Sequence, residues 1–357
     1  MRQIRWIHVG VLVALFGFSA LSPFNLQAAP PNRVAGSGLG SNSPYATDAY
    51  PGFDGLDELP KPEKKDTSWF LHVSRETPAE QLAYARQMED EGSLRAARRG
   101  YDALVREWPA SPEAPKAQLA LAMVWAKKYQ DYDEAFEALE YMLDFYPRDC
   151  DYLELVEYEY QLVNMMIKEK KTFLGFTFTS TRLCRQHYES IVRRAPGASY
   201  VPEAMLKIAD LREQEDQYEE AAQVYATLVS KFPLTPEARV ATYLEAKARM
   251  WLCRRLSYNI LRCKDTANFI TMALKRFPDL DEAEELKTWR DELMQHMAED
   301  AYVQAKFYDT KQRTRHAALT AWERFLKEYP ASPHADEARA RVEALGGSEE
   351  LRVESEE

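Results

Sequence analysis

The residue types that most often carry chemistry are sparse in this chain, and their spacing matches no reactive motif. The six histidines fit no metal-ligand spacing such as HExxH, and the four cysteines form no CxxC pair. The chain has neither a GxSxG nucleophile motif nor a glycine-rich loop that would hold a phosphate. Its many carboxylates, such as Glu154, Glu157 and Glu159, are expected on solvated helix faces. The sequence therefore predicts no catalytic, cofactor-binding or metal site, and it favours a protein that is not an enzyme.

Two of the cysteines, Cys253 and Cys263, are expected near the turn between two helices. A short-range disulfide between them is one interpretation, because residues 1–28 have the pattern of a secretory signal and an exported protein meets oxidising conditions. Two small buried thiols are the other interpretation. The sequence leaves both open.

The charge balance argues against one large class of partner. The chain of 357 residues has a formal net charge of -11, and we find no basic stripe with interleaved aromatic residues. General nucleic-acid binding depends on Lys and Arg side chains that neutralise phosphates. The sequence therefore predicts no nucleic-acid partner.

The stretch from residue 202 to residue 236 shows which elements carry these side chains. Apolar residues recur at helical spacing in both of its halves, and a polar turn separates them at residues 214–217. Pro202 suits the first turn of the first helix, and the Phe232-Pro233 pair ends the second helix. The stretch therefore predicts two antiparallel helices. Such a pair needs neighbours on both sides to bury its two apolar faces.

The aromatic-proline pair that ends this unit recurs along the chain, with prolines 37 to 52 residues apart. A small residue and an aromatic residue precede several stops at one fixed spacing. This pattern resembles that of tetratricopeptide repeats, which are helix pairs of about 34 residues. The stops are Trp108-Pro109, Tyr146-Pro147, Phe232-Pro233, Phe277-Pro278 and Tyr329-Pro330, with Ala195-Pro196 as a weaker copy; the small-aromatic pairs are Ala97/Tyr101, Cys184/Tyr188, Ala221/Tyr225 and Ala318/Trp322.

We therefore predict an all-α fold, a tetratricopeptide-repeat superhelical solenoid of about six helix pairs. A C-terminal capping helix is predicted over residues 334–345, where glycines follow. An irregular helical bundle is the alternative. Ser111, Thr235 and Ser332 each precede a proline after a stop. We expect their side chains to accept hydrogen bonds from unpaired N–H groups of the helices that follow.

Outside the repeats, the chain divides into segments of different composition. Residues 1–28 have two arginines, an apolar run and a small residue at Ala28, as in a cleaved secretory signal peptide. An uncleaved membrane anchor is the alternative, although the run is short for a span. Residues 29–75 are rich in Pro, Gly and Ser and are predicted to be a flexible linker. The solenoid is predicted over residues 76–346, and an acidic disordered tail over residues 347–357.

The third repeat is lengthened, and its two helices are joined by the predicted loop KKTFLGFTFTST. Apolar loop residues such as Phe173 and Phe176 usually cover a neighbouring groove, and a partner contact is the alternative. Before this loop stands YEYQLVNM at residues 158–165, and after it the helix RQHYESIVRRAPGASYVPEA. From about residue 77 to residue 215, this order of features resembles the outer-membrane-protein assembly factor BamD family. The late unit AEDAYVQAKFYDTKQRTRHAALTAWERFLKEYP is also similar to a late repeat of that family.

Three features depart from that family. No cysteine precedes Cys150, so the lipobox cysteine is missing and a lipid anchor is not supported. Uncharged residues stand at positions 177 and 179–181, where the family has charged ones. One extra repeat lies near residues 216–280. The chain is therefore expected to be a divergent member, or a paralogue with another envelope task.

The resemblance implies a non-enzymatic scaffold in the periplasm, associated with the outer membrane, that acts in assembly and insertion of β-barrel proteins. Its partners would be the barrel-insertion subunit and unfolded β-barrel clients. The alternatives are another periplasmic tetratricopeptide adaptor that coordinates cell-envelope or cell-wall processes, and a wall-lytic enzyme on a helical-repeat scaffold. The predicted partner-binding residues are Leu82, Arg86, Met123, Lys127, Tyr160 and Asn164 in the early repeats, Phe173 and Phe176 in the loop, and Tyr302 and Tyr308 in the late repeats.

Overall fold

The structure is a computed structural model. It describes residues 72–168, 171–173, 176–178, 181–255, 259–311 and 315–346; of the side chains between 169 and 180, nothing is described. The predicted signal peptide, nearly all of the predicted linker and the predicted tail lie outside these residues. The predicted solenoid lies largely within them.

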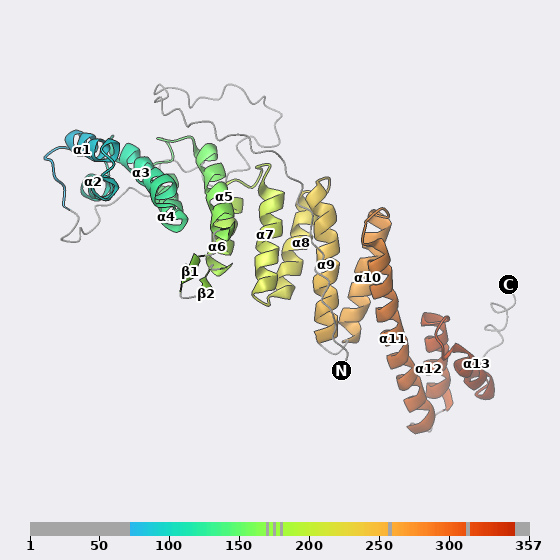
Figure 1. The fold of residues 1–357 in the computed structure, drawn as a ribbon. Helices are drawn as coiled ribbons and strands as arrows, with labels where there is room; N and C mark the ends of the chain where they lie inside the picture. The colour runs from blue at the N-terminus through green and yellow to red at the C-terminus, as the bar shows by residue number, and fades with distance from the viewer. Residues whose placement is uncertain are drawn as a thin grey trace. The chain divides into compact units, whose positions relative to one another are not determined.

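The described helices form pairs in chain order, and each packs mainly against the helices before and after it (Figure 1). This confirms the predicted all-α solenoid of about six helix pairs with a capping helix. The pairs are α1 (Pro78–Asp90) with α2 (Leu94–Glu107), α3 (Ala114–Met123) with α4 (Tyr132–Phe145), α5 (Tyr152–Lys168) with α6 (Thr181–Arg194), α7 (Val201–Gln214) with α8 (Tyr218–Lys231), α9 (Pro236–Arg255) with α10 (Ile260–Arg276), and α11 (Ala283–Lys311) with α12 (Arg315–Glu328), followed by the single helix α13 (Ala335–Ala344).

The loop predicted in the third repeat contains a short β-hairpin, so that part of the prediction was wrong (Figure 1). Strands β1 (Lys171–Phe173) and β2 (Phe176–Phe178) pair antiparallel, with Phe173 opposite Phe176. Each strand combines Thr with Phe, and β-branched and aromatic residues favour extended backbone. A two-residue connection between such runs is a hairpin signal that outweighs the loop interpretation.

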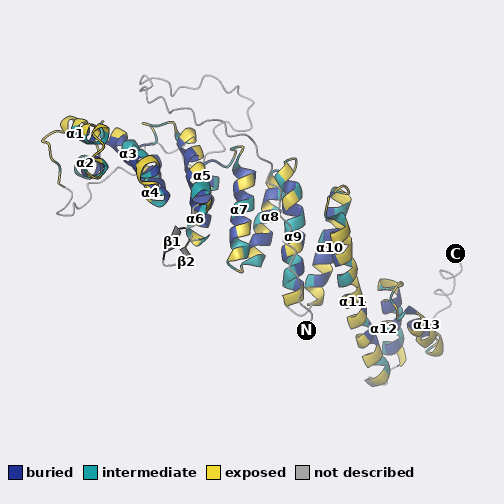
Figure 2. Ribbon diagram, viewed as in Figure 1, coloured by how far each residue is buried: buried dark blue, intermediate teal, exposed yellow. Residues whose placement is uncertain are grey.

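The small and aromatic residues of the repeat pattern lie at the centre of the helix packing. Ala97, Cys184, Ala221 and Ala318 are at most 2% exposed, and so are the aromatic residues that follow them. Figure 2 shows buried residues along the faces by which neighbouring helices meet. Gly100 extends the same rule, because a Cβ atom there would lie 2.9 Å from the Cβ of Ala85 on α1. Close helix approach therefore requires small residues at these positions.

The motif aromatics also form a recurring hydrogen bond back to the preceding helix. The Tyr101 hydroxyl donates to Glu89 at 2.8 Å, and the Tyr225 hydroxyl donates to Glu213 at 3.0 Å. The indole N–H of Trp322 donates in the same way to Asp309, at 3.2 Å. Each bond ties the second helix of a pair to the end of the first. The aromatic ring thus fills the interface, and its polar atom fixes the alignment of the pair.

The predicted helix caps are mostly wrong in detail, although the helices do begin close to the predicted positions. The Ser111 hydroxyl has no hydrogen-bond partner among the described residues, and the Thr235 hydroxyl donates to the carbonyl of Phe232 at 3.0 Å. Ser332 accepts a hydrogen bond from the backbone N–H of His334, at 3.3 Å. A turn separates Ser111 and Ser332 from the helices that follow, and backbone carbonyls of these residues satisfy the first helical N–H groups instead.

Three of the turns inside helix pairs hold a residue with left-handed backbone. Gly92 closes α1, Asp216 closes α7, and Gln130 ends the π-helical turn η2 (Val124–Tyr129) that follows α3. Their φ angles are 78°, 60° and 54°.

Among the described helices, none has both the length and the apolar character needed to cross a bilayer.

Candidate functional site

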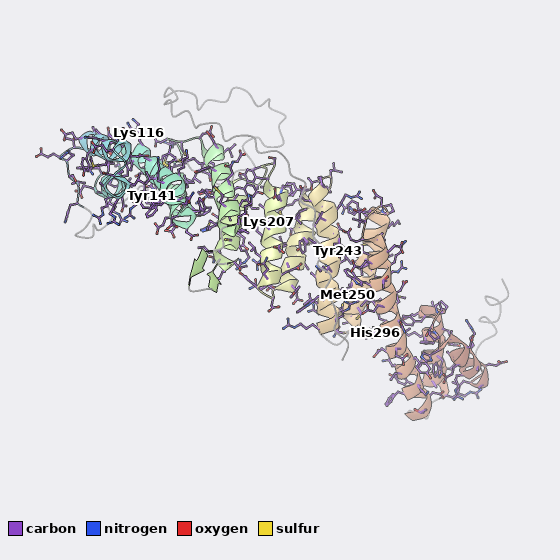
Figure 3. The ribbon with its side chains drawn as sticks, viewed as in Figure 1. Lys116, Tyr141, Lys207, Tyr243, Met250 and His296 are labelled. Atoms are coloured by element: carbon purple, nitrogen blue, oxygen red, sulfur yellow. The ribbon has the colours of Figure 1, made fainter. Side chains whose placement is uncertain are left out.

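A cavity of about 320 Å³ lies between α2 and α4, with α3 and η2 as its third side. Its volume falls at the lower end of the range for small-ligand pockets. The lining is mixed in character and includes Arg98 and Arg106 from α2, Trp125 from η2, and Glu134, Glu137 and Tyr141 from α4 (Figure 3 labels Tyr141).

A buried glutamine on the first helix of each of the first two pairs joins that helix to its partner. Gln118 on α3 donates from its amide nitrogen to the carbonyl of Ala138 on α4, at 2.7 Å. Gln81 on α1 does the same to the carbonyl of Gly100 on α2, at 3.1 Å. Both side chains are at most 4% exposed, so both bonds are shielded from water. The cavity therefore lies between two helix pairs, and a buried hydrogen bond joins the two helices within each pair.

The π-helical turn η2 carries the aromatic wall of the cavity. Trp125 and Tyr129 lie on this turn, with ring centroids 5.1 Å apart. The backbone N–H of Asp131 closes the turn on the carbonyl of Trp125 at 3.1 Å, and Gln130 there adopts left-handed backbone. Single π-helical turns within helices occur often at functional sites. The sequence pattern gave no signal for this turn.

Arg98 is the cation that faces this wall. Its guanidinium carbon lies 4.5 Å from the ring centroid of Trp125 and 6.0 Å from that of Tyr129. Such a cation–π contact holds the guanidinium without neutralising it. Its Nε atom is buried and has no hydrogen-bond partner among the described residues. Arg98 is thus fixed in place with hydrogen-bonding capacity left over.

Of the carboxylates that line the cavity, Asp102 forms an ion pair, and Glu134 and Glu137 do not within the described residues. Arg106 and Asp102 form an ion pair with each other at 2.7 Å. Glu134 and Glu137 are exposed, and within the described ranges neither forms an ion pair. Burial of part of the Glu134 side chain raises the pKa of that carboxyl, and the negative charges of Glu137 and Asp131 raise it further, whereas the positive charge of Arg98 lowers it. The rim of the cavity at α4 is therefore electronegative.

The structure places the predicted partner-binding residues of the early repeats at different depths. Arg86 and Lys127 are exposed, and Met123 is half-buried. Leu82 is only 6% exposed and Tyr160 only 8% exposed, so both pack inside the fold. Burial accounts for these two residues without a partner, and their role in binding stays a prediction.

A hydrogen bond accounts for Asn164, and a ring contact adds to the burial of Tyr160. The amide oxygen of Asn164 accepts a hydrogen bond from the hydroxyl of the buried Tyr188, at 2.7 Å. The ring of Tyr160 stacks on that of Tyr200, with centroids 4.7 Å apart. The first contact joins α5 to α6, and the second joins α5 to the residue directly before α7. Phe173 and Phe176 face each other across the hairpin, and their side chains lie outside the described part of the chain.

In the late repeats, Tyr302 is an interior residue. It is 7% exposed, its ring stacks on that of His334 at 3.9 Å, and its hydroxyl donates to Glu337 at 2.8 Å. These contacts join α11 to the capping region. Tyr308 is half-buried, and a partner role for it stays a prediction.

Cys253 and Cys263 are fully buried free thiols in the structure. They lie on α9 and α10 near the turn between these helices, and the Cys253 sulfur lies 3.3 Å from the hydroxyl oxygen of Thr266. Burial, together with the neighbouring Cys253 thiol, raises the pKa of Cys263 to about 12. The thiol is therefore protonated and unreactive at neutral pH. Disulfide formation between them stays a prediction.

One polar cluster was not foreseen from sequence. Arg194 on α6 contacts Glu140 and Asp144 of α4 and Glu159 of α5, at 3.3, 2.8 and 3.2 Å. Glu159 has no exposed surface, so the prediction that it lies on a solvated helix face was wrong. The cluster joins three consecutive helices. Within the described ranges, no group of three or more His, Cys, Asp and Glu side chains is arranged to hold a metal ion.

Comparison with known proteins supports the repeat interpretation. Profiles of the tetratricopeptide repeat match residues 89–149 and residues 203–235. The first match covers most of the helices around the cavity, and the second covers α7 and α8. Protein–protein interaction is the usual task of this repeat. No curated protein matches the chain significantly.

Solved structures of tetratricopeptide-repeat proteins also align with the chain, at low similarity. One from Parabacteroides merdae is 15% identical, with 78% of this chain and 96% of that chain covered and a TM-score of 0.27. The C-terminal part of one from Cytophaga hutchinsonii is 14% identical, with coverages of 74% and 88% and a TM-score of 0.29.

Proposed function

We propose that this protein is a non-enzymatic scaffold that binds other polypeptides through its helix repeats. The observation that carries the proposal is the array of helix pairs, two parts of which match tetratricopeptide repeats. Each pair buries one set of faces against its neighbours and leaves other faces of the helices exposed, as such repeats do when they bind partners. The repeats suggest protein partners in general.

A more specific role rests on the resemblance to the BamD family. We propose that the chain acts in the periplasm, at the outer membrane, in the assembly and insertion of β-barrel proteins. The signal-like segment 1–28 supports export, and the lengthened third repeat with its FLGF segment supports the family resemblance. Its partners would be the barrel-insertion subunit and unfolded β-barrel clients.

Depletion of the protein in its native host tests this role. We expect the abundance of outer-membrane β-barrel proteins to fall, and re-expression of the full chain to restore it. Cross-linking of the full chain in intact cells should capture a barrel-insertion protein. Unchanged β-barrel abundance, together with localisation at division sites, would instead favour an adaptor of cell-wall processes. Hydrolysis of wall fragments by the purified protein would contradict the non-enzymatic proposal.

A further inference from the structure

The cavity between α2 and α4 holds charged groups that the fold itself leaves unpaired. Asp102 and Arg106 neutralise each other, and this pair contributes no net charge to the lining. Of the remaining charged residues that line the cavity, Arg98 supplies one positive charge and Glu134 and Glu137 supply two negative charges. Within the described residues, none of these three has an ion-pair partner. A complementary ligand therefore needs a positive charge and a hydrogen-bond acceptor.

The arrangement disfavours an anionic ligand. A carboxylate or phosphate that approached Arg98 would also face Glu134 and Glu137, and like charges at close range are repulsive. Trp125 already holds the guanidinium of Arg98 over its ring at 4.5 Å, so this cation is stabilised without an anion.

We propose that this cavity receives a basic side chain, Lys or Arg, of an extended peptide segment from a partner protein. The ammonium or guanidinium group binds between Glu134 and Glu137. The aliphatic stem packs against the aromatic residues of the lining, Trp125 and Tyr141, as the stems of basic side chains do on apolar surfaces. A backbone carbonyl of the same peptide accepts a hydrogen bond from Arg98.

This inference rests on the proposed scaffold function and names the chemistry of one contact. The π-helical turn η2 then has a role, since it carries Trp125 and Tyr129 on the side of the guanidinium.

Titration of the full chain with short peptides tests the proposal. The probes are acetylated and amidated pentapeptides, Ala-Ala-X-Ala-Ala, in which X is Lys, Gln or Glu. The protein is labelled with fluorotryptophan, and the fluorine NMR signal of Trp125 is assigned by its loss in a W125F variant. We expect the Lys peptide to shift the Trp125 signal and to bind about fivefold more tightly than the Gln peptide, since partly exposed ion pairs contribute on this scale. The Glu peptide should bind most weakly.

Two double variants separate this contact from general electrostatics. In E134Q/E137Q, the preference for Lys over Gln should disappear. The matched control is E154Q/E157Q, which removes two exposed carboxylates at the same spacing on α5, away from the cavity. It should leave the preference unchanged.

Equal binding of the three peptides, a preference for Glu, or no shift of the Trp125 signal would overturn the proposal. A Lys preference that survives in E134Q/E137Q would overturn it as well. If cross-linking of the full chain still captures protein partners in any of these cases, the scaffold function stands and only this contact fails. If no protein is captured, the scaffold proposal itself fails.

Discussion

Glu159 has no exposed surface, and the guanidinium of Arg194 is the cation that faces it. That guanidinium also contacts Glu140 and Asp144, so one positive charge is shared among three carboxylates. Burial raises the pKa of Glu159 from an ordinary value of 4.5 to about 8, although the charge of Arg194 lowers it. We hold that burial dominates, because a shared cation neutralises each carboxylate only in part. The most buried of the three therefore retains its proton near neutral pH.

This raised pKa predicts a loss of stability toward alkaline pH. A group with a raised pKa in the folded state stabilises the fold fully below its unfolded pKa, here 4.5, and this contribution is lost as the pH rises through about 8. Between about pH 6.5 and about pH 8.5, the free energy of unfolding should fall by about 2 kcal/mol. Glu159→Gln should remove most of that fall. Urea unfolding curves of both proteins at the two pH values measure it.

The neighbours of Glu159 define the control for this experiment. His187 packs against Phe136 with ring centroids 3.7 Å apart, and burial lowers its pKa. Its protonation destabilises the fold only toward acid, so measurements above about pH 6.5 avoid it. The pKa values of Tyr152 and Arg194 are raised, which places their titration above this range. Parallel curves for the wild type and Glu159→Gln would contradict the assignment to this carboxyl.

At the scale of single elements, three turns inside helix pairs require a residue with left-handed backbone. The same left-handed position holds Gly92 in the first pair, Gln130 in the second and Asp216 in the fourth. Glycine adopts this conformation without steric cost, whereas a residue with a Cβ atom is strained by about 1–2 kcal/mol. The second pair therefore retains some strain at Gln130.

Replacing Gln130 with glycine should relieve this strain. We expect Gln130→Gly to raise the free energy of unfolding by about 0.5 kcal/mol, because the relief exceeds the entropic cost of glycine in the unfolded chain. The matched control is Gln223→Gly on the exposed face of α8, where glycine should cost about 1 kcal/mol. Denaturant unfolding of both variants measures the change in the free energy of unfolding, which should be positive for Gln130→Gly and negative for Gln223→Gly. Destabilisation by Gln130→Gly would show that the turn holds no strain.

Much of the element order could be predicted from sequence, because the prolines and the apolar periodicity are local signals. The stops at Trp108, Phe232 and Phe277 each lie directly after the last residue of a helix, and α9 begins at the predicted Pro236. The caps failed because Ser111 and Ser332 lie in turns that precede their helices. Which hydroxyl accepts which N–H depends on turn geometry that residue type does not determine.

The cavity could not be predicted, because its residues are far apart in the sequence and each looks ordinary alone. Arg98, Trp125 and Glu134 come from three elements, and only their packing shows that they share one space. The burial of Glu159 was missed for a similar reason. Its guanidinium partner, Arg194, lies 35 positions later on another helix.

At the scale of the whole molecule, the core consists of separate clusters along the chain. One involves α9, α10 and the first half of α11, and another involves the rest of α11 with α12 and α13. In a repeat array each unit contacts its neighbours, so stability is a sum of local terms. A substitution that disrupts one terminal cluster should therefore destabilise only that cluster and the helices next to it.

A charge in the last cluster tests this locality. Val342 on α13 is 6% exposed and packs in the cluster with Trp322 and Phe325. We expect Val342→Asp to speed amide hydrogen exchange by at least about tenfold in residues 298–345 and to leave residues 81–145 unchanged. Val303→Asp on α11 is the control, since Val303 is 57% exposed and should have little effect. Faster exchange along the whole chain would mean that the array unfolds as one cooperative unit.

The helix α11 is continuous over 29 residues and serves both of these clusters. Leu293 and Met297 face the first cluster, and Ala298 and Tyr302 face the second. An uninterrupted helix fixes their angular phase, since each residue turns the chain by about 100°. One residue inserted after Met297 would rotate every later side chain by that angle and present polar surface to the second cluster. Seven inserted residues, or about two helical turns, would leave a mismatch of only about 20°. Insertions in α11 should therefore be tolerated when their length is close to a whole number of helical turns.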